Sequence, residues 1–319
     1  MSVVRAVLAD PALPGRLALQ EVEYPHATPS EALVRVGAIS LNRGEVRRAL
    51  AAETSWRPGW DLAGIVEQAA VDGSGPKQGA RVVGLLLSGA WAEVVAVPTN
   101  SLAELPATVS LTQAATLPVA GLTALYTLEK GGSLLGRNVL VTGASGGAGH
   151  FAIQLAVYAG VQQVVGVVRQ EQYVLFVREA GAHEVVVSDD GQAAGKYGPY
   201  DRVIDSVGGQ VLGNILGMLA PNGTCVNFGV SAISTVTFDL RSFYIVGGTS
   251  LQGFYLFQEL QHESAQSGLT RLGRLVEAQH IHPHIALEES WENISDVAQH
   301  LMERRFAGKA VLTVTPGLK

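Results

Sequence analysis

The chain has 319 residues, of which 47% are hydrophobic and 16% charged, so it can bury a large core and is not a disordered chain. The formal net charge is -6, and no block of lysine and arginine is long enough for a nucleic-acid surface. The N-terminus lacks an apolar signal region, and no apolar run reaches the roughly 18 residues of a membrane span. We therefore expect a cytoplasmic protein that binds neither nucleic acid nor membrane.

The pattern of the first third of the chain predicts short strands rich in β-branched residues. Glycine and proline separate these runs, as in a compact and mostly antiparallel β unit. From residue 110 the apolar residues adopt helical spacing, and Pro118 divides this stretch into two predicted helices. The strands are predicted at residues 31–40, 64–70, 80–87 and 90–98.

Strands and helices alternate in the middle of the chain, which predicts a parallel, doubly wound α/β sheet. From residue 253 the chain adds helices, and it closes with a strand at 309–314 that we expect to return to the N-terminal β unit. The predicted strands are 139–142, 164–168, 183–187, 202–205, 223–228 and 244–250, and the predicted helices are 149–159, 172–180 and 211–219.

A glycine-rich turn follows the first strand of this alternating region. In ASGGAG, residues 144–149, the spacing is that of G-x-G-x-x-G with Ala144 in the first position. Gly146 lets the backbone approach a pyrophosphate, and Gly149 lets the following helix pack closely on the strand. The free N–H groups of the helix N-terminus favour phosphate. The turn therefore predicts dinucleotide binding.

The residue that ends the second strand of the unit is Arg169, where an acidic side chain would bind the ribose hydroxyls of NAD. An arginine there suits the 2′-phosphate and predicts NADP(H). The same turn also fits the short-chain dehydrogenase pattern, whose Tyr-x-x-x-Lys pair should follow the turn. Here the only such pair, Tyr126 and Lys130, precedes it, which disfavours that alternative.

Taken in order along nearly the whole chain, several segments resemble the medium-chain dehydrogenase/reductase superfamily, in particular its quinone oxidoreductase branch. The resemblance implies a GroES-like catalytic domain made of residues 1–115 and 253–319, with an NADP-binding Rossmann domain, residues 116–252, inserted between them. The segments are ISLNRGEV (39–46), RPGWDLAGIV (57–66), GAWAEVVAVP (89–98), AATLPVAGLTA (114–124), the glycine turn, VIDSVGG (203–209) and GKAVLTV (308–314).

Many members of the superfamily use zinc, and this sequence departs from their pattern. It has Trp60 and Asp61 where they carry Gly-His-Glu, and no cysteine precedes this motif or lies in residues 94–111. His280, His282 and His284 would share one face of an extended segment, but no cysteine lies nearby. We therefore expect no metal. The single cysteine lies in an apolar strand, where an inert buried thiol is expected.

The resemblance also implies the site residues. Asn42 and Glu45 are the candidates for the catalytic region, without an assigned proton donor. Ser145, Gly146, Gly147 and Ala148 should hold the pyrophosphate. The remaining cofactor contacts that it implies are Arg169 and Ser188 on the adenosine side, Val207, Phe228, Gly229, Val230, Ser250 and Leu251 along the nicotinamide path, and Asn42, Thr123 and Lys309 near the nicotinamide.

A reductase without a metal favours a conjugated acceptor, because the developing enolate or quinol oxygen needs only hydrogen-bond donors. The sequence thus predicts an NADPH-dependent reductase of quinones or α,β-unsaturated carbonyl compounds. Two alternatives stay open. The first is reduction of an enoyl thioester or a biosynthetic intermediate, with the basic residues 43–48 near a phosphopantetheine, and the second is a non-catalytic NADPH-binding role. The resemblance further implies a homodimer, joined through the predicted strand at 244–250.

Overall fold

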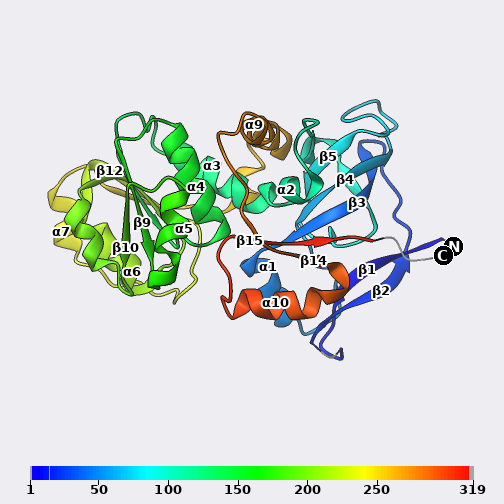
Figure 1. The fold of residues 1–319 in the computed structure, drawn as a ribbon, viewed down its shortest axis with the longest axis horizontal. Coiled ribbons are helices and arrows are strands. Elements are labelled where there is room, and N and C mark those ends of the chain that lie inside the picture. The colour runs from blue at the N-terminus through cyan, green and yellow to red at the C-terminus, as the bar shows by residue number, and fades with distance from the viewer. Residues whose placement is uncertain (1, 14, 316–319) are drawn as a thin grey trace. The chain divides into compact units, whose positions relative to one another are not determined.

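The computed structural model describes residues 2–13 and 15–315 (Figure 1). The chain divides into two compact units: unit 1 is Met1–Leu122 with Leu260–Lys319, and unit 2 is Thr123–Glu259. The domain boundaries predicted from the sequence, after residues 115 and 252, lie a short distance before these divisions. Among the described residues, no helix combines the length and the apolar character needed to cross a membrane.

Unit 1 is built mainly from antiparallel strands. Strand β15 (Lys309–Thr313) pairs antiparallel with β3 (Glu31–Leu41), Ala310 lying opposite Leu41, so this strand returns to the N-terminal β unit as predicted. Strands β1 (Val3–Ala9) and β2 (Leu17–Glu23) form a separate pair. The larger sheet has the order β14 (Ile285–Ser290), β15 (Lys309–Thr313), β3 (Glu31–Leu41), β4 (Asp61–Gln68), β5 (Arg81–Leu85) and β7 (Leu102–Glu104), with β6 (Val94–Pro98) also on β3.

Helices pack against this sheet and close the core of unit 1. Trp91 and Trp291, which lie 200 positions apart along the chain, are both completely buried in one apolar cluster with Leu62. Burial of such large side chains contributes about 1.5–3 kcal/mol each. The helices are α1 (Arg43–Leu50), α2 (Leu111–Ala115), a π-helical turn at Leu117–Gly121, α9 (Ala265–Glu277) and α10 (Ile294–Met302).

Unit 2 is a six-stranded parallel sheet, which confirms the predicted α/β class (Figure 1). The sheet runs in the order β10 (Glu184–Val187), β9 (Gln163–Val168), β8 (Asn138–Thr142), β11 (Tyr200–Asp205), β12 (Leu219–Asn227) and β13 (Ser250–Gly253). The order along the chain reverses between β8 and β11, and ligands of such sheets bind at the carboxyl ends of the strands beside this reversal. The helices are α3 (Leu122–Glu129), α4 (Gly147–Tyr158), α5 (Val174–Glu179), α6 (Gly209–Leu216), α7 (Leu240–Ile245) and α8 (Leu256–Glu259).

The prediction of a strand at residues 244–250 is wrong. Residues 240–245 form helix α7, whose N-terminus is capped by the Asp239 carboxylate accepting from the Arg241 N–H. Gly247 and Gly248 then adopt positive φ angles of 81° and 69°, which no extended strand tolerates. The sixth strand therefore begins only at Ser250.

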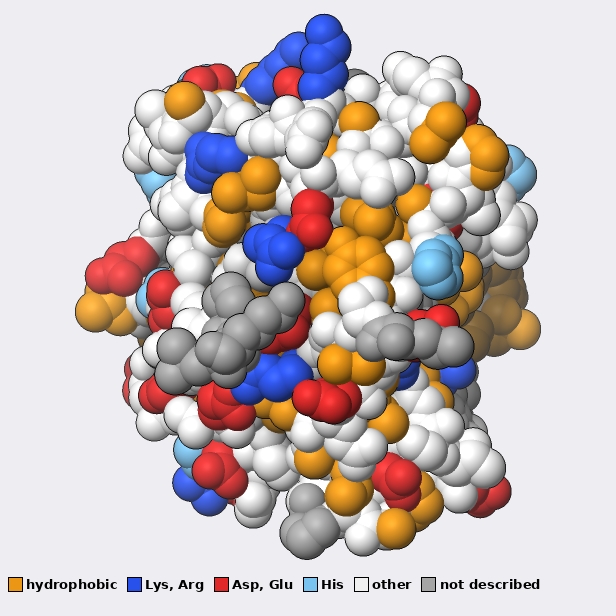
Figure 2. Space-filling model, turned by 90° about the vertical axis from the view of Figure 1, so that its right-hand side faces the viewer, with side chains coloured by type: hydrophobic (Ala, Val, Ile, Leu, Met, Phe, Trp, Pro, Cys, Tyr) orange, Lys and Arg blue, Asp and Glu red, His pale blue; other side chains and the backbone are white. Residues whose placement is uncertain are grey.

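The two predicted helices around Pro118 are present, joined by the π-helical turn that contains this proline. Tyr126 of α3 is buried, and Lys130 forms an ion pair with Glu259 at 2.7 Å. On the face of the molecule shown in Figure 2, acidic and basic side chains are interspersed among polar and apolar ones, so their fields oppose one another there.

Candidate functional site

The glycine turn joins the carboxyl end of β8 to the first turn of α4. Gly143 has a φ of +59°, and Gly146 is the N-cap residue of the helix. A Cβ on Gly149 would lie 2.9 Å from the Cα of Ala144 and closer still to the carbonyl oxygen of Gly143. Only glycine therefore allows α4 to start this close to β8.

The N-terminus of α4 offers free main-chain donors. No side chain of the described residues caps it, and the first helical bond runs from the His150 N–H to the Gly146 carbonyl at 2.9 Å. The N–H groups of the first turn then lack intrahelical acceptors, and the helix dipole adds partial positive charge. Ser145 and Ala148 are partly exposed beside them. This end of the helix can bind a phosphate.

The two residues predicted on the adenosine side differ in what they can offer. Arg169 follows β9 directly, is exposed, and has no side-chain partner among the described residues, so its guanidinium can receive an anion. The Ser188 hydroxyl donates to the Asp190 carboxylate at 2.9 Å and accepts from the Gly191 N–H at 2.9 Å. The only hydroxyl proton of Ser188 is therefore used in a hydrogen bond within its own turn.

Asp205 organises the carboxyl ends of three neighbouring strands, and sequence reasoning did not single it out. It is completely buried at the end of β11. It accepts from the Thr142 hydroxyl at 2.6 Å, the Asn227 amide at 2.7 Å and the Gly208 N–H at 3.1 Å. The available signal was an acidic residue at the end of an apolar run in VIDSVGG. Through these bonds the loops after β8, β11 and β12 are held in place.

A cavity of about 540 Å³ lies where β12 and β13 end. Three residues predicted on the nicotinamide path, Phe228, Gly229 and Val230, line it, together with Gly253 at the end of β13 and Phe254 directly after it. The cavity is a candidate site for a flat ring. Val207 follows the end of β11, and Thr123 is buried in the first turn of α3.

The register of β13 separates two predicted residues from this edge. Ser250 lies beside Thr224 and Leu251 beside Cys225, whereas Gly253 lies beside Asn227 at the carboxyl end. The Ser250 hydroxyl donates to the Thr224 hydroxyl at 3.1 Å. The structure therefore does not bring Ser250 and Leu251 to the cavity, because the strand begins six residues later than predicted.

The remaining predicted residues gather in unit 1, in a buried polar cluster. Asn42 occupies the N-cap position of α1, Glu45 lies in the first turn of this helix, and Lys309 is the first residue of β15. Asp61 at the start of β4 joins them: it accepts from the Ser40 hydroxyl and the Asn42 amide, both at 2.7 Å, and from Lys309 at 3.4 Å. Its second oxygen accepts from the Val119 N–H at 2.9 Å.

Burial shifts the acid–base behaviour of this cluster. It raises the pKa of Glu45 well above its usual range, and the negative charge of Asp61 adds to the rise while Lys309 opposes it. Burial lowers the pKa of Lys309, against the attraction of Asp61 and Glu45. One Glu45 oxygen accepts from the Asn42 N–H at 2.8 Å, whereas the other has no partner among the described residues. Glu45 is thus suited to be the protonated carboxyl.

Residues 56–60 lie beside the cluster in the chain and carry two tryptophans. The Arg48 guanidinium stacks on Trp56, 4.6 Å from the ring centroid, and the Trp60 Nε1–H donates to the Leu87 carbonyl at 3.1 Å. Arg43 donates to the carbonyls of residues 301 and 302 at the end of α10. Arg43 and Arg48 are therefore engaged in contacts within unit 1.

The side chains at residues 60 and 61 do not fit a zinc ligand set. An indole cannot ligate zinc, and the Asp61 carboxylate is saturated by four hydrogen bonds. Within the described ranges, no three histidine, cysteine, aspartate or glutamate side chains gather as a metal site would require, and this holds for the histidines at 280, 282 and 284. Cys225 is buried, which raises the pKa of its thiol.

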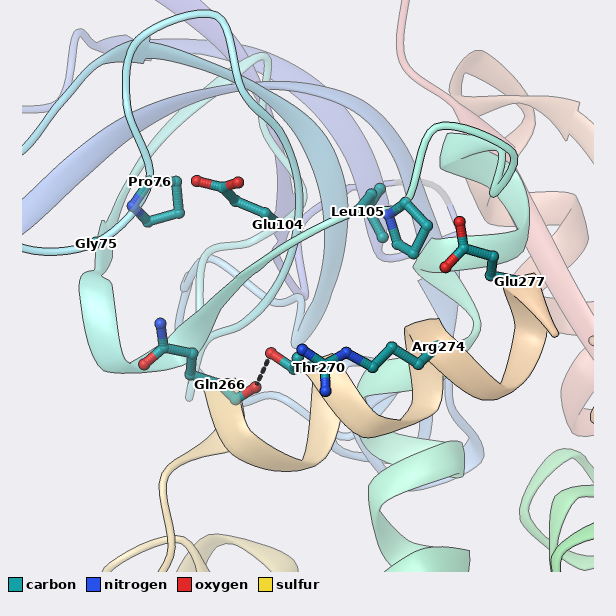
Figure 3. A pocket seen from close by; sticks show the side chains of 9 residues that line it. Gly75, Pro76, Glu104, Leu105, Gln266, Thr270, Arg274 and Glu277 are labelled. Atoms are coloured by element: carbon teal, nitrogen blue, oxygen red, sulfur yellow. Dashed lines mark hydrogen bonds between the residues drawn. The ribbon is translucent and has the colours of Figure 1, made fainter.

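A second groove, of about 570 Å³, lies on unit 1 between α9 and the segments around β7 (Figure 3). Arg274 and Thr270 extend from α9 along it, and Glu104 and Glu277 lie at opposite ends (Figure 3). None of the residues predicted from the sequence lines this groove. Its lining combines acidic and basic side chains with proline and leucine.

Comparison with known proteins gives matches over both parts of the chain. Residues 28–107 match the family described as alcohol dehydrogenase GroES-like domain, and residues 147–272 match the family described as zinc-binding dehydrogenase. The chain is 27% identical to quinone oxidoreductase-like protein 2 of Bos taurus, over 93% of this chain and 89% of that protein. It is 32% identical to the chloroplastic quinone-oxidoreductase QR1 of Triphysaria versicolor, over 64% of this chain and 67% of that protein.

The fold is also found among solved structures. A mycobacterial protein solved in complex with NADPH superimposes with a TM-score of 0.85 at 23% identity, over 97% of this chain and 99% of that one. At this identity the likeness establishes the common fold of the two proteins.

Proposed function

Because the chain belongs to the medium-chain dehydrogenase/reductase superfamily and is similar to its quinone oxidoreductases, we propose that it is a zinc-independent, NADPH-dependent reductase of quinones or α,β-unsaturated carbonyl compounds. The observation that carries the proposal is the uncapped N-terminus of α4 behind the glycine turn. It lies at the carboxyl edge of a parallel sheet beside the reversal in strand order, where dinucleotides bind.

The residues around this edge supply the contacts that the cofactor needs. Ser145 to Ala148 would hold the pyrophosphate through main-chain N–H groups, and the exposed Arg169 would pair with the 2′-phosphate. Phe228 to Val230, which line the cavity, would face the nicotinamide, as would Val207 after β11. Thr123 of unit 2 and Asn42 of unit 1 are the further contacts that the family resemblance implies. The mycobacterial protein of the same fold was solved with NADPH, which supports this choice of cofactor.

When bound, the reduced nicotinamide supplies a hydride to the β-carbon of an enone or to a quinone. The chain contributes by orienting the two reactants and excluding water, since correct positioning lowers the barrier substantially. Its main-chain N–H groups would stabilise the oxygen on which negative charge develops. Solvent would supply the final proton to that oxygen.

The test is NADPH oxidation, followed by its absorbance, with a panel of quinones, enones and an enoyl-CoA, and with NADH in parallel. We expect turnover with a quinone or an enone and a preference for NADPH. Turnover with the enoyl-CoA alone would replace the proposal by thioester reduction. Tight NADPH binding without turnover on any acceptor would make the protein a non-catalytic binder.

We also propose a homodimer. Strand β13 is at the edge of the parallel sheet, and Leu251 on it is 44% exposed. Helix α7 next to it in sequence exposes Leu240, Tyr244 and Ile245, each about 60% exposed. An open apolar edge of this kind is an aggregation hazard unless another copy covers it.

A further inference from the structure

The ammonium of Lys309 has no donor left for a ligand. Its side chain is 4% exposed, and Nζ donates to the Leu41 carbonyl at 3.0 Å, the Asn42 Oδ1 at 2.6 Å and the Asp61 carboxylate at 3.4 Å. A lysine ammonium has three donors and no acceptor. All three are used within unit 1.

The Asn42 amide is nearly as fully engaged. Both of its Nδ2 hydrogens are used, one by Glu45 Oε1 at 2.9 Å and the other by Asp61 Oδ2 at 2.7 Å. Its Oδ1 accepts from Lys309, which also fixes the orientation of the amide, since the oxygen must face the ammonium. One lone pair of Oδ1 is the only capacity that remains, so Asn42 can accept a hydrogen bond from a ligand and cannot donate one.

The charges of the cluster balance when Glu45 keeps its proton. The cluster holds two carboxyls and one ammonium, all completely or almost completely buried. The unpartnered second oxygen of Glu45 fits a neutral carboxyl, whereas Asp61 accepts four hydrogen bonds, as an ionised carboxylate does. The cluster then contains one Asp61–Lys309 ion pair and no net charge, which is the arrangement that burial tolerates.

We propose that Lys309 is a positioning residue that never touches the cofactor. It compensates Asp61 and fixes the Asn42 amide, so that the free lone pair of Oδ1 meets a hydroxyl or amide N–H donor of the nicotinamide nucleoside. This inference rests on the proposed function for the identity of the ligand, and on the geometry of unit 1 for the role of Lys309. It differs from the direct cofactor contact that the sequence resemblance implies.

The first test compares Lys309→Met, Asp61→Asn and the double variant with the unaltered protein. We measure thermal unfolding without cofactor and the Kd for NADPH by fluorescence titration. Lys309→Met leaves Asp61 charged and unpaired, so both stability and NADPH affinity should fall, the affinity on the order of tenfold. The double variant has no buried charge left to compensate, and the Asn42 amide still donates to Glu45 Oε1, which keeps its orientation. Both the melting temperature and the NADPH affinity should therefore return most of the way.

A double variant that regains stability but binds NADPH as weakly as Lys309→Met would overturn the proposal, because the uncompensated charge of Asp61 would then not account for the loss of affinity. NADPH binding that is unchanged in Lys309→Met would overturn it as well. If the unaltered protein does not bind NADPH, the proposed function fails, while recovery of stability in the double variant still reports on the cluster.

The second test needs no variant. Reductive methylation of the cofactor-free protein, read by peptide mass spectrometry, should leave Lys309 unmodified and modify the exposed Lys77, which serves as the control. A direct cofactor contact requires an accessible amine. Methylation of Lys309 at the rate of Lys77, with protection by NADPH, would refute the positioning role.

Discussion

Arg169 is the residue on which the preference for NADPH depends in the proposed function. Its guanidinium is exposed at the end of β9 and has no side-chain partner in the described part of the chain. It can therefore bind an anion without breaking another side-chain contact. A charge-assisted hydrogen bond contributes about 1.5–3 kcal/mol. Arg169→Gln should therefore lower the ratio of kcat/KM for NADPH to that for NADH by about ten- to a hundredfold.

The matched control for this change is Arg178→Gln. Arg178 is another exposed arginine of the same unit, on α5, and pairs with Glu184 at 3.4 Å. Its replacement should leave the ratio as it is. An unchanged ratio in Arg169→Gln would show that the 2′-phosphate is recognised elsewhere.

Glu45 makes stability depend on pH in a defined direction. Its pKa in the folded protein is raised above the ordinary value of 4.5, so the folded state keeps a proton that the unfolded chain releases. Its contribution is fully present below pH 4.5 and is lost as the pH rises through the folded pKa, by at most about 1.4 kcal/mol per pH unit. In Glu45→Gln the side-chain amide has nearly the same shape as the protonated carboxyl, and it does not ionise.

The melting temperature of Glu45→Gln should therefore rise relative to that of the unaltered protein between pH 5 and pH 8. Glu53→Gln, at an exposed position shortly after α1, is the control and should run parallel to the unaltered protein. If the melting temperatures of Glu45→Gln and of the unaltered protein also differ by a constant amount from pH 5 to pH 8, Glu45 is ionised in the folded protein.

At the scale of elements, Asp205 ties β11 to its neighbours β8 and β12. Asp205→Ala would leave the Thr142 hydroxyl and the Asn227 amide without this acceptor in a buried site, and should cost roughly 2–4 kcal/mol in the free energy of unfolding. Urea unfolding measures this. Asp201→Ala, at the partly exposed other end of the same strand, removes the ion pair with Arg137 and the hydrogen bond from the Asn138 N–H. Water can replace both contacts there, so this variant should cost about 1 kcal/mol, less than Asp205→Ala. Equal losses in both variants would contradict the assigned role of Asp205.

The elements that could be predicted are those whose signal is local. The strands of the parallel sheet are buried on both faces and read as uninterrupted apolar runs, as in residues 163–168. The segment FYIV, residues 243–246, is equally apolar, but it is exposed and belongs mainly to a capped helix. A short apolar run does not distinguish these cases, because exposure depends on what packs against it.

The same limit applies to the two parts of the candidate site. The glycine turn is contiguous, so its spacing alone predicts the phosphate-binding helix. The ion pair of Lys309 with Asp61 joins residues 248 positions apart, and it exists because β3 pairs with β15 on one side and β4 on the other. No local pattern encodes that register, so the role of Asp61 appears only in the structure.

At the scale of the whole molecule, the homodimer is the remaining prediction. Light scattering at micromolar concentration should give twice the chain mass of 33.5 kDa. Leu251→Lys places a charge on the edge strand β13, so the charges of two copies would repel across a paired edge and the mass should fall toward that of one chain. Val187→Lys is the matched control: Val187 is 39% exposed on β10, the opposite edge of the same sheet, and its replacement should leave the dimer intact. If Val187→Lys alone dissociates it, the copies join through β10, and a single-chain mass for the unaltered protein would exclude the dimer.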